Sequence, residues 1–206
     1  MPISLTLPFT SSDVNALQLG DMVSISGDLL TGRDQAHKWL YEQICRGSDH
    51  RDKEDAHVLD AIQPILQDGL IYHCGPIVSG HETGNYRFIS AGPTTSMRQE
   101  PYQSAIMRHF KMKGVIGKGG MGEKTLNACK TLPAVYFHAV GGAAALAARA
   151  VIEVLNVYKL EFGLPEALWH IRVVDFPAIV TIDAHGNSLH DEIQTRSKSV
   201  LESLVK

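Results

Sequence analysis

Lys113-Gly114-Val115-Ile116-Gly117-Lys118-Gly119-Gly120 and, upstream of it, Gly92-Pro93-Thr94-Thr95-Ser96-Met97-Arg98 are the two stretches that decide the fold. Each contains a short turn with a fixed cation, hydroxyls or free backbone N–H groups, and each turn follows an apolar run typical of a strand. In α/β proteins, turns that leave the ends of strands are where anionic ligands bind. The two stretches therefore predict an α/β fold with an anion site at one edge of its sheet.

The bulk composition predicts one packed domain over residues 1–206. The chain is 44% hydrophobic and 20% charged, with a net charge of −3. This slightly acidic balance, without a basic face, argues against a nucleic-acid partner. The mixed charges of residues 46–55 indicate a solvated loop. We expect a cytoplasmic protein with no membrane segment, because residues 1–9 lack a signal-peptide pattern and glycines and Arg149 interrupt the longest apolar run, at 139–150.

Cysteine and histidine spacings do not indicate a metal site in this chain. Cys45, Cys74 and Cys129 form no CxxC pair. We therefore expect buried or half-buried free thiols, in place of disulfides or iron–sulfur ligands. The ten histidines contain no zinc-type pair, and each is interpreted as structural.

Hydrophobic periodicity alternates between helix and strand through the middle of the chain, which favours a mixed sheet. A hairpin is expected around the glycines of residues 80–84, and a turn at Asp175-Phe176-Pro177. The cap of the first helix is expected at Ser11 or Ser12. The predicted helices are 11–17, 33–45, 58–66, 101–110, 123–130, 143–155 and 190–205. The predicted strands are 4–8, 21–31, 70–74, 86–91, 114–116, 134–139, 169–174 and 178–183.

Three cations occupy strand-to-helix turns: Arg33, Arg98 and Lys118. Arg98 can clamp a carboxylate with two parallel N–H bonds, whereas Lys118 offers a mobile point charge. Asp34, at the start of a helix, is interpreted as its cap. A site with three cations would carry excess positive charge unless its ligand is a dianion. The sequence therefore predicts a small dicarboxylate ligand.

The hydroxyls of Thr94 and Thr95 have two open interpretations. They could cap the following helix, or one of them could contact substrate or accept a proton. A threonine base needs a neighbouring carboxylate or an electropositive pocket, and a partner could supply the carboxylate. The glycine-rich stretch 113–120 fits neither nucleotide-binding motif, and its four glycines are expected to form an anion nest.

Six motifs together resemble the β subunit, or equivalent C-terminal domain, of class I iron–sulfur fumarases and L-tartrate dehydratases. The resemblance runs from about residue 20 to 192. The motifs are SGDLLTGRDQAH (26–37), HCGPIV (73–78), AGPTTSMR (91–98), GKGGMG (117–122), AVGGAAA (139–145) and LPEALW (164–169).

The resemblance implies a single swivelling β/β/α domain and reversible addition of water across the C=C bond of a dicarboxylate. It also implies a [4Fe-4S] cluster acting as a Lewis acid and held by the cysteines of a partner α subunit, within a hetero-oligomer or homodimer. By the same resemblance, Arg33, Arg98 and Lys118 bind substrate carboxylates. Thr94 is the base that exchanges the C3 proton, next to an acid from the α subunit.

The resemblance leaves the substrate open. AVGGAAA is more similar to fumarases, which favours hydration of fumarate to (S)-malate. TTSMR followed by an acid is more similar to tartrate dehydratases, which favours conversion of L-tartrate to oxaloacetate. A function of another class is a cluster-free module that binds a dicarboxylate without turnover.

Overall fold

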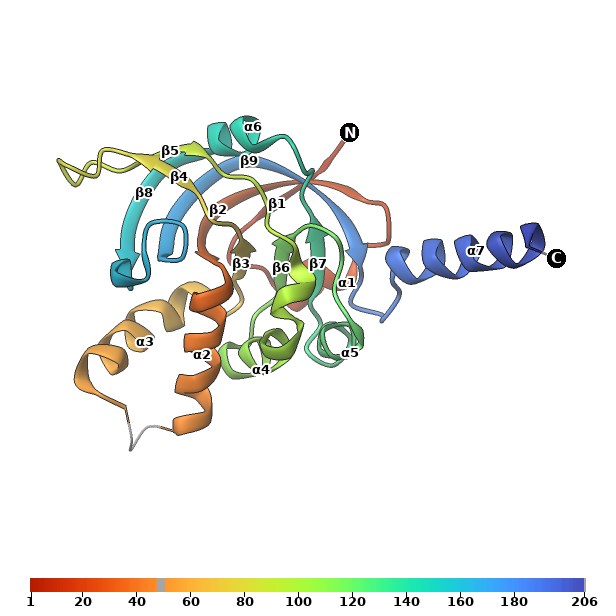
Figure 1. Ribbon diagram of the computed structural model, residues 1–206, viewed down its shortest axis with the longest axis horizontal. Coiled ribbons are helices and arrows are strands. Elements are labelled where there is room, and N and C mark those ends of the chain that lie inside the picture. The colour runs from red at the N-terminus through yellow and green to blue at the C-terminus, as the bar shows by residue number, and fades with distance from the viewer. Residues whose placement is uncertain (48–50, 206) are drawn as a thin grey trace.

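The computed structural model describes residues 1–47 and 51–205 (Figure 1). Its centre is a mixed seven-stranded sheet in the order β1-β2-β3-β6-β7-β9-β8, in which β9 also pairs with β2. Within this sheet β1, β2, β3, β6 and β7 pair in parallel, whereas β9 is antiparallel to β2, β7 and β8. The sheet therefore closes into a barrel-like arrangement, and the predicted α/β class with a mixed sheet is confirmed. The strands are β1 (Ile3–Thr6), β2 (Met22–Gly32), β3 (Leu70–His73), β6 (Gly114–Gly117), β7 (Val135–His138), β8 (Val151–Tyr158) and β9 (Leu168–Ile182).

Four helices lie along one side of the sheet (Figure 1). They are α2 (Asp34–Arg46), α3 (Lys53–Leu66), α4 (Glu100–Phe110) and α5 (Glu123–Thr131). The apolar stripe predicted for the first of them is confirmed, since Ala36 and Leu40 are fully buried and Ile44 packs partly against the same core. Burial of a leucine side chain such as that of Leu40 contributes about 2 kcal/mol. This packing fixes α2 and α4 against the sheet.

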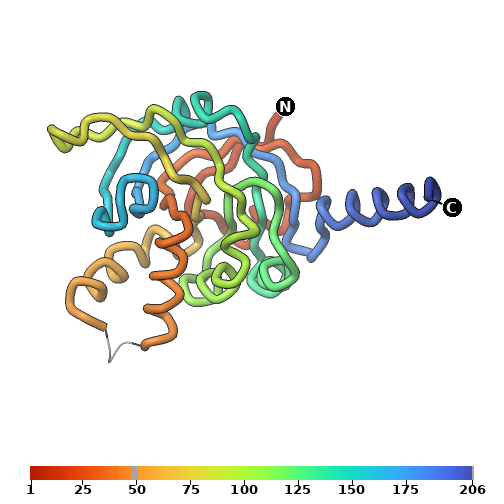
Figure 2. Tube along the Cα trace, viewed as in Figure 1, coloured from red at the N-terminus to blue at the C-terminus, as the bar shows by residue number. Residues whose placement is uncertain are grey.

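A second core lies on the other side of the central strands, around Phe137, Trp169 and Tyr72. It is covered by α1 (Ser11–Asn15), α6 (Ala144–Ala150) and the hairpin of β4 (Ile77–Ser79) and β5 (Arg87–Ser90). In the described part of the chain, two short 3₁₀ helices, η2 (Ser96–Gln99) and η3 (Leu160–Phe162), complete the connections. The last helix, α7 (Leu189–Leu204), buries none of its residues and extends away from the body (Figures 1 and 2).

Three sequence predictions of elements were wrong. The helix predicted over 143–155 ends at Ala150, because the β-branched run that follows pairs with β9 as strand β8. The predicted turn at 175–177 is a bend inside the continuous strand β9, where Asp175 has a positive φ of 53° and accepts from Ser24 Oγ. The hairpin around residues 80–84 forms as expected, but its first strand is β4 and not the strand predicted at 70–74, which joins the main sheet as β3.

Smaller differences concern caps and exposure. Thr10, one residue before the expected serines, caps α1 and forms a capping box with Asp13. Cys45 is exposed, whereas Cys74 and Cys129 are buried as expected, and all three are free thiols. The predicted solvated loop at 46–55 is shortened, since α3 already begins at Lys53, and residues 48–50 of it lie outside the described residues.

Candidate functional site

The carboxyl ends of three neighbouring parallel strands meet at one edge of the sheet. Gly32 is in register with His73, so β2 and β3 end side by side, and β6 is the next strand along. Arg33 directly follows β2, and Lys118 directly follows β6. Neighbouring strands lie about 4.8 Å apart, so these turns share a span of roughly 10 Å. The sequence correctly placed both cations at this edge.

The segment that carries Thr94 is fixed between β3 and β6 by backbone hydrogen bonds. The Thr94 N–H donates to the His73 carbonyl at 2.7 Å, and the Ser96 N–H donates to the Lys118 carbonyl at 2.9 Å. Thr95 forms a parallel bridge with Lys118. Thr94 is therefore held at the same edge as the cations, on backbone that the sheet itself orients.

Arg98 links Thr94 to Asp34. Its Nη2 group donates to Thr94 Oγ1, and its Nε donates to Asp34 Oδ1 at 3.1 Å. Since a guanidinium can only donate, Thr94 keeps its own hydroxyl proton for another partner. The adjacent positive charge also favours the ionised form of the Thr94 oxygen. The electropositive surroundings that a threonine base requires are thus supplied by Arg98.

Asp34 and Glu166 balance the charge of the arginines, and the sequence analysis missed both roles. Asp34 does not cap α2 with its side chain; its carboxylate instead accepts from Arg98 and from Gln99 Nε2 at 2.6 Å. The Glu166 carboxylate lies 3.2 Å from Arg33 Nε and accepts from the Gln35 N–H at 2.9 Å. Glu166 lies inside the quoted motif LPEALW, but only the fold shows that it faces Arg33.

Arg33 has little freedom to move. An added Cβ at Gly75 would lie 2.8 Å from Arg33 Cδ and 2.8 Å from the Pro165 carbonyl oxygen. Because residue 75 is a glycine, the Arg33 side chain can lie between the Gly75 backbone and the turn that contains Pro165, before β9. The Glu166 carboxylate on one side and the Gly75 backbone on the other fix the direction of the guanidinium.

Lys118 is half-buried and has no ion-pair partner among the described residues, unlike Arg33 and Arg98. Its charge remains available to a ligand.

Of the four glycines in residues 113–120, Gly119 and Gly120 have positive φ, at 81° and 77°. Gly114 and Gly117 are strand residues where a Cβ would collide with neighbours, so the predicted four-glycine anion nest was wrong for these two.

Neither Thr94 nor Thr95 caps the next helix with its side chain, since the 3₁₀ turn at 96–99 has no side-chain cap.

Glu100, the acid that follows the Arg98 motif, has a structural role. The Glu100 carboxylate accepts from the Gly122 and Lys124 N–H groups, both at 2.9 Å, and from Thr125 Oγ1 at 2.7 Å. It caps the N-terminus of α5 and is not aimed at the edge with Arg33 and Lys118, so it carries no information about the substrate.

The described residues of this chain do not suit an iron–sulfur cluster. They contain no group of three His, Cys, Asp or Glu side chains that could hold a metal ion. Burial raises the pKa of the Cys74 and Cys129 thiols to about 12, which keeps both protonated, whereas cluster ligands are thiolates.

No helix in the described part of the chain combines the length and apolar character needed to cross a membrane.

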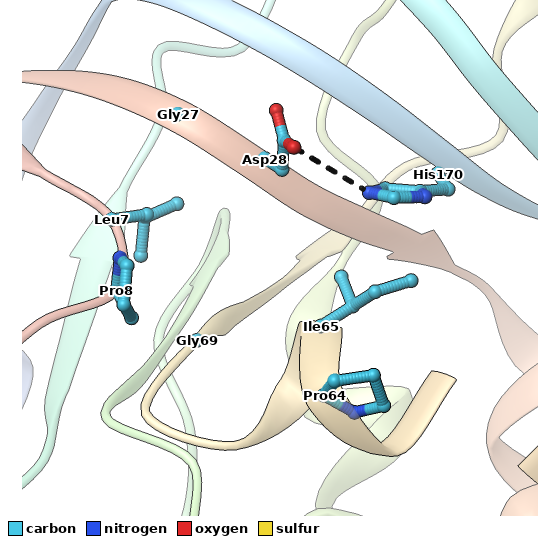
Figure 3. Close-up of a pocket in the computed structure, with 8 residues that line it drawn as sticks. All are labelled: Leu7, Pro8, Gly27, Asp28, Pro64, Ile65, Gly69 and His170. Atoms are coloured by element: carbon cyan, nitrogen blue, oxygen red, sulfur yellow. Dashed lines mark ion pairs between the residues drawn. The ribbon is translucent and has the colours of Figure 1, made fainter. Parts of the chain in front are cut away.

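A separate pocket of about 350 Å³ lies at the opposite end of β3, near Gly69 (Figure 3). Its polar groups are Asp28 and His170, 3.9 Å apart. The Asp28 carboxylate is already held by two hydrogen bonds from Arg172, at 2.7 and 2.9 Å. This pocket contains none of the predicted site residues, so the candidate site is the edge with Arg33, Thr94, Arg98 and Lys118.

The family model described as Fumarase C-terminus matches residues 1–193. A putative fumarate hydratase class I of Geobacillus stearothermophilus is 47% identical over 203 residues, a match that covers 98% of this chain but only 35% of that relative.

Two shorter relatives match over most of their own length. A putative L(+)-tartrate dehydratase subunit beta of Methanocaldococcus jannaschii is 35% identical over 95% of each chain. The L(+)-tartrate dehydratase subunit beta of Escherichia coli K12 is 37% identical over 90% of this chain and 85% of its own. The sequence resemblance is thereby confirmed, and the chain belongs to the fumarase C-terminus family.

Proposed function

We propose that this chain, a single domain over residues 1–206, is the β part of a hydro-lyase that adds water across the C=C bond of a dicarboxylate. The favoured reaction is fumarate plus water to (S)-malate. The observation that carries the proposal is the hydrogen bond from Arg98 to Thr94 Oγ1, beside two further cations at the same edge. This arrangement combines a proton-transfer group with charges that suit a dianion.

In the proposed mechanism, Arg33 and Lys118 bind the substrate carboxylates, and Arg98 binds substrate while it polarises the Thr94 hydroxyl. In the hydration direction, the Thr94 hydroxyl gives its proton to C3. In the dehydration direction, the Thr94 oxygen takes that proton from C3. The guanidinium of Arg98 stabilises the oxygen while it lacks the proton. Thr94 is half-buried, which leaves it open to substrate from the solvent side.

We further propose that a partner α chain completes the site. Two relatives are named subunit beta, and a third is about three times longer than the matched part. The two acids beside the arginines at this edge, Asp34 and Glu166, are both engaged with them, so an acid from a partner would supply the missing carboxylate. The [4Fe-4S] cluster and a catalytic acid would both reside in that partner, in a cytoplasmic hetero-oligomer. The steps assigned to this chain use only its own side chains.

L-tartrate to oxaloacetate is the second candidate reaction, because the shorter relatives carry that name. The higher identity, 47%, to a relative named putative fumarate hydratase supports fumarate as the first choice. A module that binds a dicarboxylate without turnover is the third candidate.

Thr94→Ala tests the proposed role of the hydroxyl. In the complex with its α partner, turnover should fall by at least about 100-fold, the lower end of the range for loss of one acid–base group, while binding of malate by calorimetry stays within about threefold. Thr95→Ala, at the exposed neighbouring threonine, is the matched control and should keep most activity. Equal loss of binding and turnover in Thr94→Ala would overturn the assignment.

A further inference from the structure

Five buried polar side chains lie beneath the candidate site, and the proposed mechanism uses none of them. Each has a relative exposure of zero. They come from five different elements: α2, β3, η2, α4 and β7. Buried polar groups are costly unless they are paired, so a connected set of this size requires an explanation. In chain order they are His37, His73, Ser96, Gln103 and Tyr136.

The side chains form one continuous chain of hydrogen bonds. His37 Nδ1 lies 2.8 Å from the Arg33 carbonyl oxygen. His37 Nε2 and His73 Nε2 lie 3.0 and 2.9 Å from Gln103 Oε1, an atom whose assignment as O or N follows from the hydrogen-bond partners. His73 Nδ1 lies 2.8 Å from Ser96 Oγ. The backbone that carries Arg33 is thereby connected to the turn that carries Thr94.

The proton positions in this chain follow from the partners. A carbonyl oxygen only accepts, so His37 Nδ1 must carry a proton, and Nε2 of the neutral ring is then an acceptor. The Gln103 amide must therefore present its NH₂ end to both imidazoles, and His73 in turn donates from Nδ1 to Ser96. With Oε1 facing the imidazoles, His37 would have to be charged, and the Gln103 NH₂ group, which finds no partner among the described residues, would stay buried and unpaired. Exchanging the amide O and N removes both costs.

Ser96 anchors the far end of the chain. Its Oγ also accepts from the Tyr136 hydroxyl at 2.8 Å, while its N–H donates to the Lys118 carbonyl. A Cβ at Gly117 would lie 1.9 Å from Ser96 Oγ and 3.1 Å from both His73 Nδ1 and the Tyr136 hydroxyl. Glycine in this strand thus provides the space in which the serine, histidine and tyrosine meet.

We propose that His37, Gln103, His73 and Ser96 are positioning residues that set the spacing between Arg33 and Thr94 through two neutral imidazoles protonated at Nδ1. The assignment of this effect to catalysis rests on the proposed hydro-lyase function, whereas the proton arrangement does not. The residues contact no substrate in this proposal. They act by fixing the backbone on both sides of the reacting carbon.

The proton arrangement is tested on the full chain by long-range ¹H–¹⁵N correlation of the imidazole rings at pH 7.5. Both rings should show a protonated Nδ1 and a bare Nε2. An Nε2-protonated ring or an imidazolium at either position would overturn the proposal. This measurement needs no partner and no turnover, so it tests the proton arrangement even if the hydro-lyase function is wrong.

Gln103→Glu tests the positioning role in the complex with the α partner. The carboxylate has the shape of the amide but no N–H, so both Nε2 atoms must carry protons and His37 must become charged. We expect kcat to fall about 100-fold, as for a displacement of about 1 Å in a reacting group, with KM changed less than about threefold. Gln194→Glu, on the exposed face of α7, is the control. Unchanged kcat with altered imidazole signals would overturn the positioning role.

Discussion

Acidification should destabilise the fold through His37, and the size of the effect can be worked from the structure. Burial lowers the pKa of His37 from 6.5 to about 4, against smaller opposing contributions from the Arg33 carbonyl and the Asp34 charge. Since the folded pKa is depressed, the unfolded chain binds the proton first. The stability contributed by the neutral ring is therefore complete above pH 6.5 and is lost as the pH falls toward 4.

At pH 5 the loss from His37 alone is about 2 kcal/mol, since each pKa unit corresponds to about 1.4 kcal/mol. Burial also lowers the pKa of His73 well below its usual value, which adds to the effect in the same direction. Asp28 and Glu161 have lowered pKa values because of Arg172 and Lys159, so their contributions are lost only nearer pH 4 and below. The interval from pH 7.5 to 5 therefore reports mainly on histidines.

The assay is urea unfolding of the full chain at pH 7.5 and pH 5, with wild type, His37→Asn and His81→Asn compared. With a slope of about 2 kcal/mol per molar urea, His37 should account for a decrease of about 1 M in the wild-type midpoint. That decrease should be absent in His37→Asn and retained in His81→Asn, which changes an exposed histidine. Equal pH dependence in wild type and His37→Asn would refute the reasoning, and His37→Gln repeats the test if the asparagine variant does not fold.

Other predictions concern the arginines and the packing around the site. Arg98→Lys should raise KM and lower kcat about tenfold or more in steady-state assays of the complex, because a lysine cannot bond Thr94 and the substrate in the guanidinium geometry; unchanged constants would exclude a direct role. Glu166→Gln should raise KM with a smaller change in kcat, since Arg33 loses the nearer of its two carboxylate partners, and an unchanged KM would argue against this orienting role. Gly117→Ala should lower the free energy of unfolding by about 1–3 kcal/mol in urea, as overpacking does, and a stability equal to wild type would contradict the collision derived for its Cβ.

The positions of Arg33 and Lys118 could be predicted from sequence because each directly follows a strand, and parallel strands end at a common edge. Arg98, in η2, reaches the same edge because the segment before it is held between β3 and β6. Their partners could not be predicted in this way. Asp34 meets Arg98 across 64 residues and Glu166 meets the N-terminus of α2 across 131, so these contacts depend on strand order. Local patterns do not encode that order.

The same limit explains the errors in the elements. The alanine-rich run at 143–150 is helical by propensity, but the residues after it are decided by pairing with β9. Pro177 suggested a turn, yet it is exposed at the bend of β9, where the missing N–H costs little. The sequence led to each buried histidine being interpreted as structural on its own, because their connection through Gln103 exists only in three dimensions.

The most direct test of the account is an anaerobic assay of this chain produced together with its candidate α partner. Fumarate formation from (S)-malate and oxaloacetate formation from L-tartrate are followed in parallel, with Thr94→Ala as the inactive control. The account predicts turnover of malate that requires both chains and the Thr94 hydroxyl. An assembled, cluster-loaded complex that turns over neither compound, or that keeps full activity in Thr94→Ala, would contradict it.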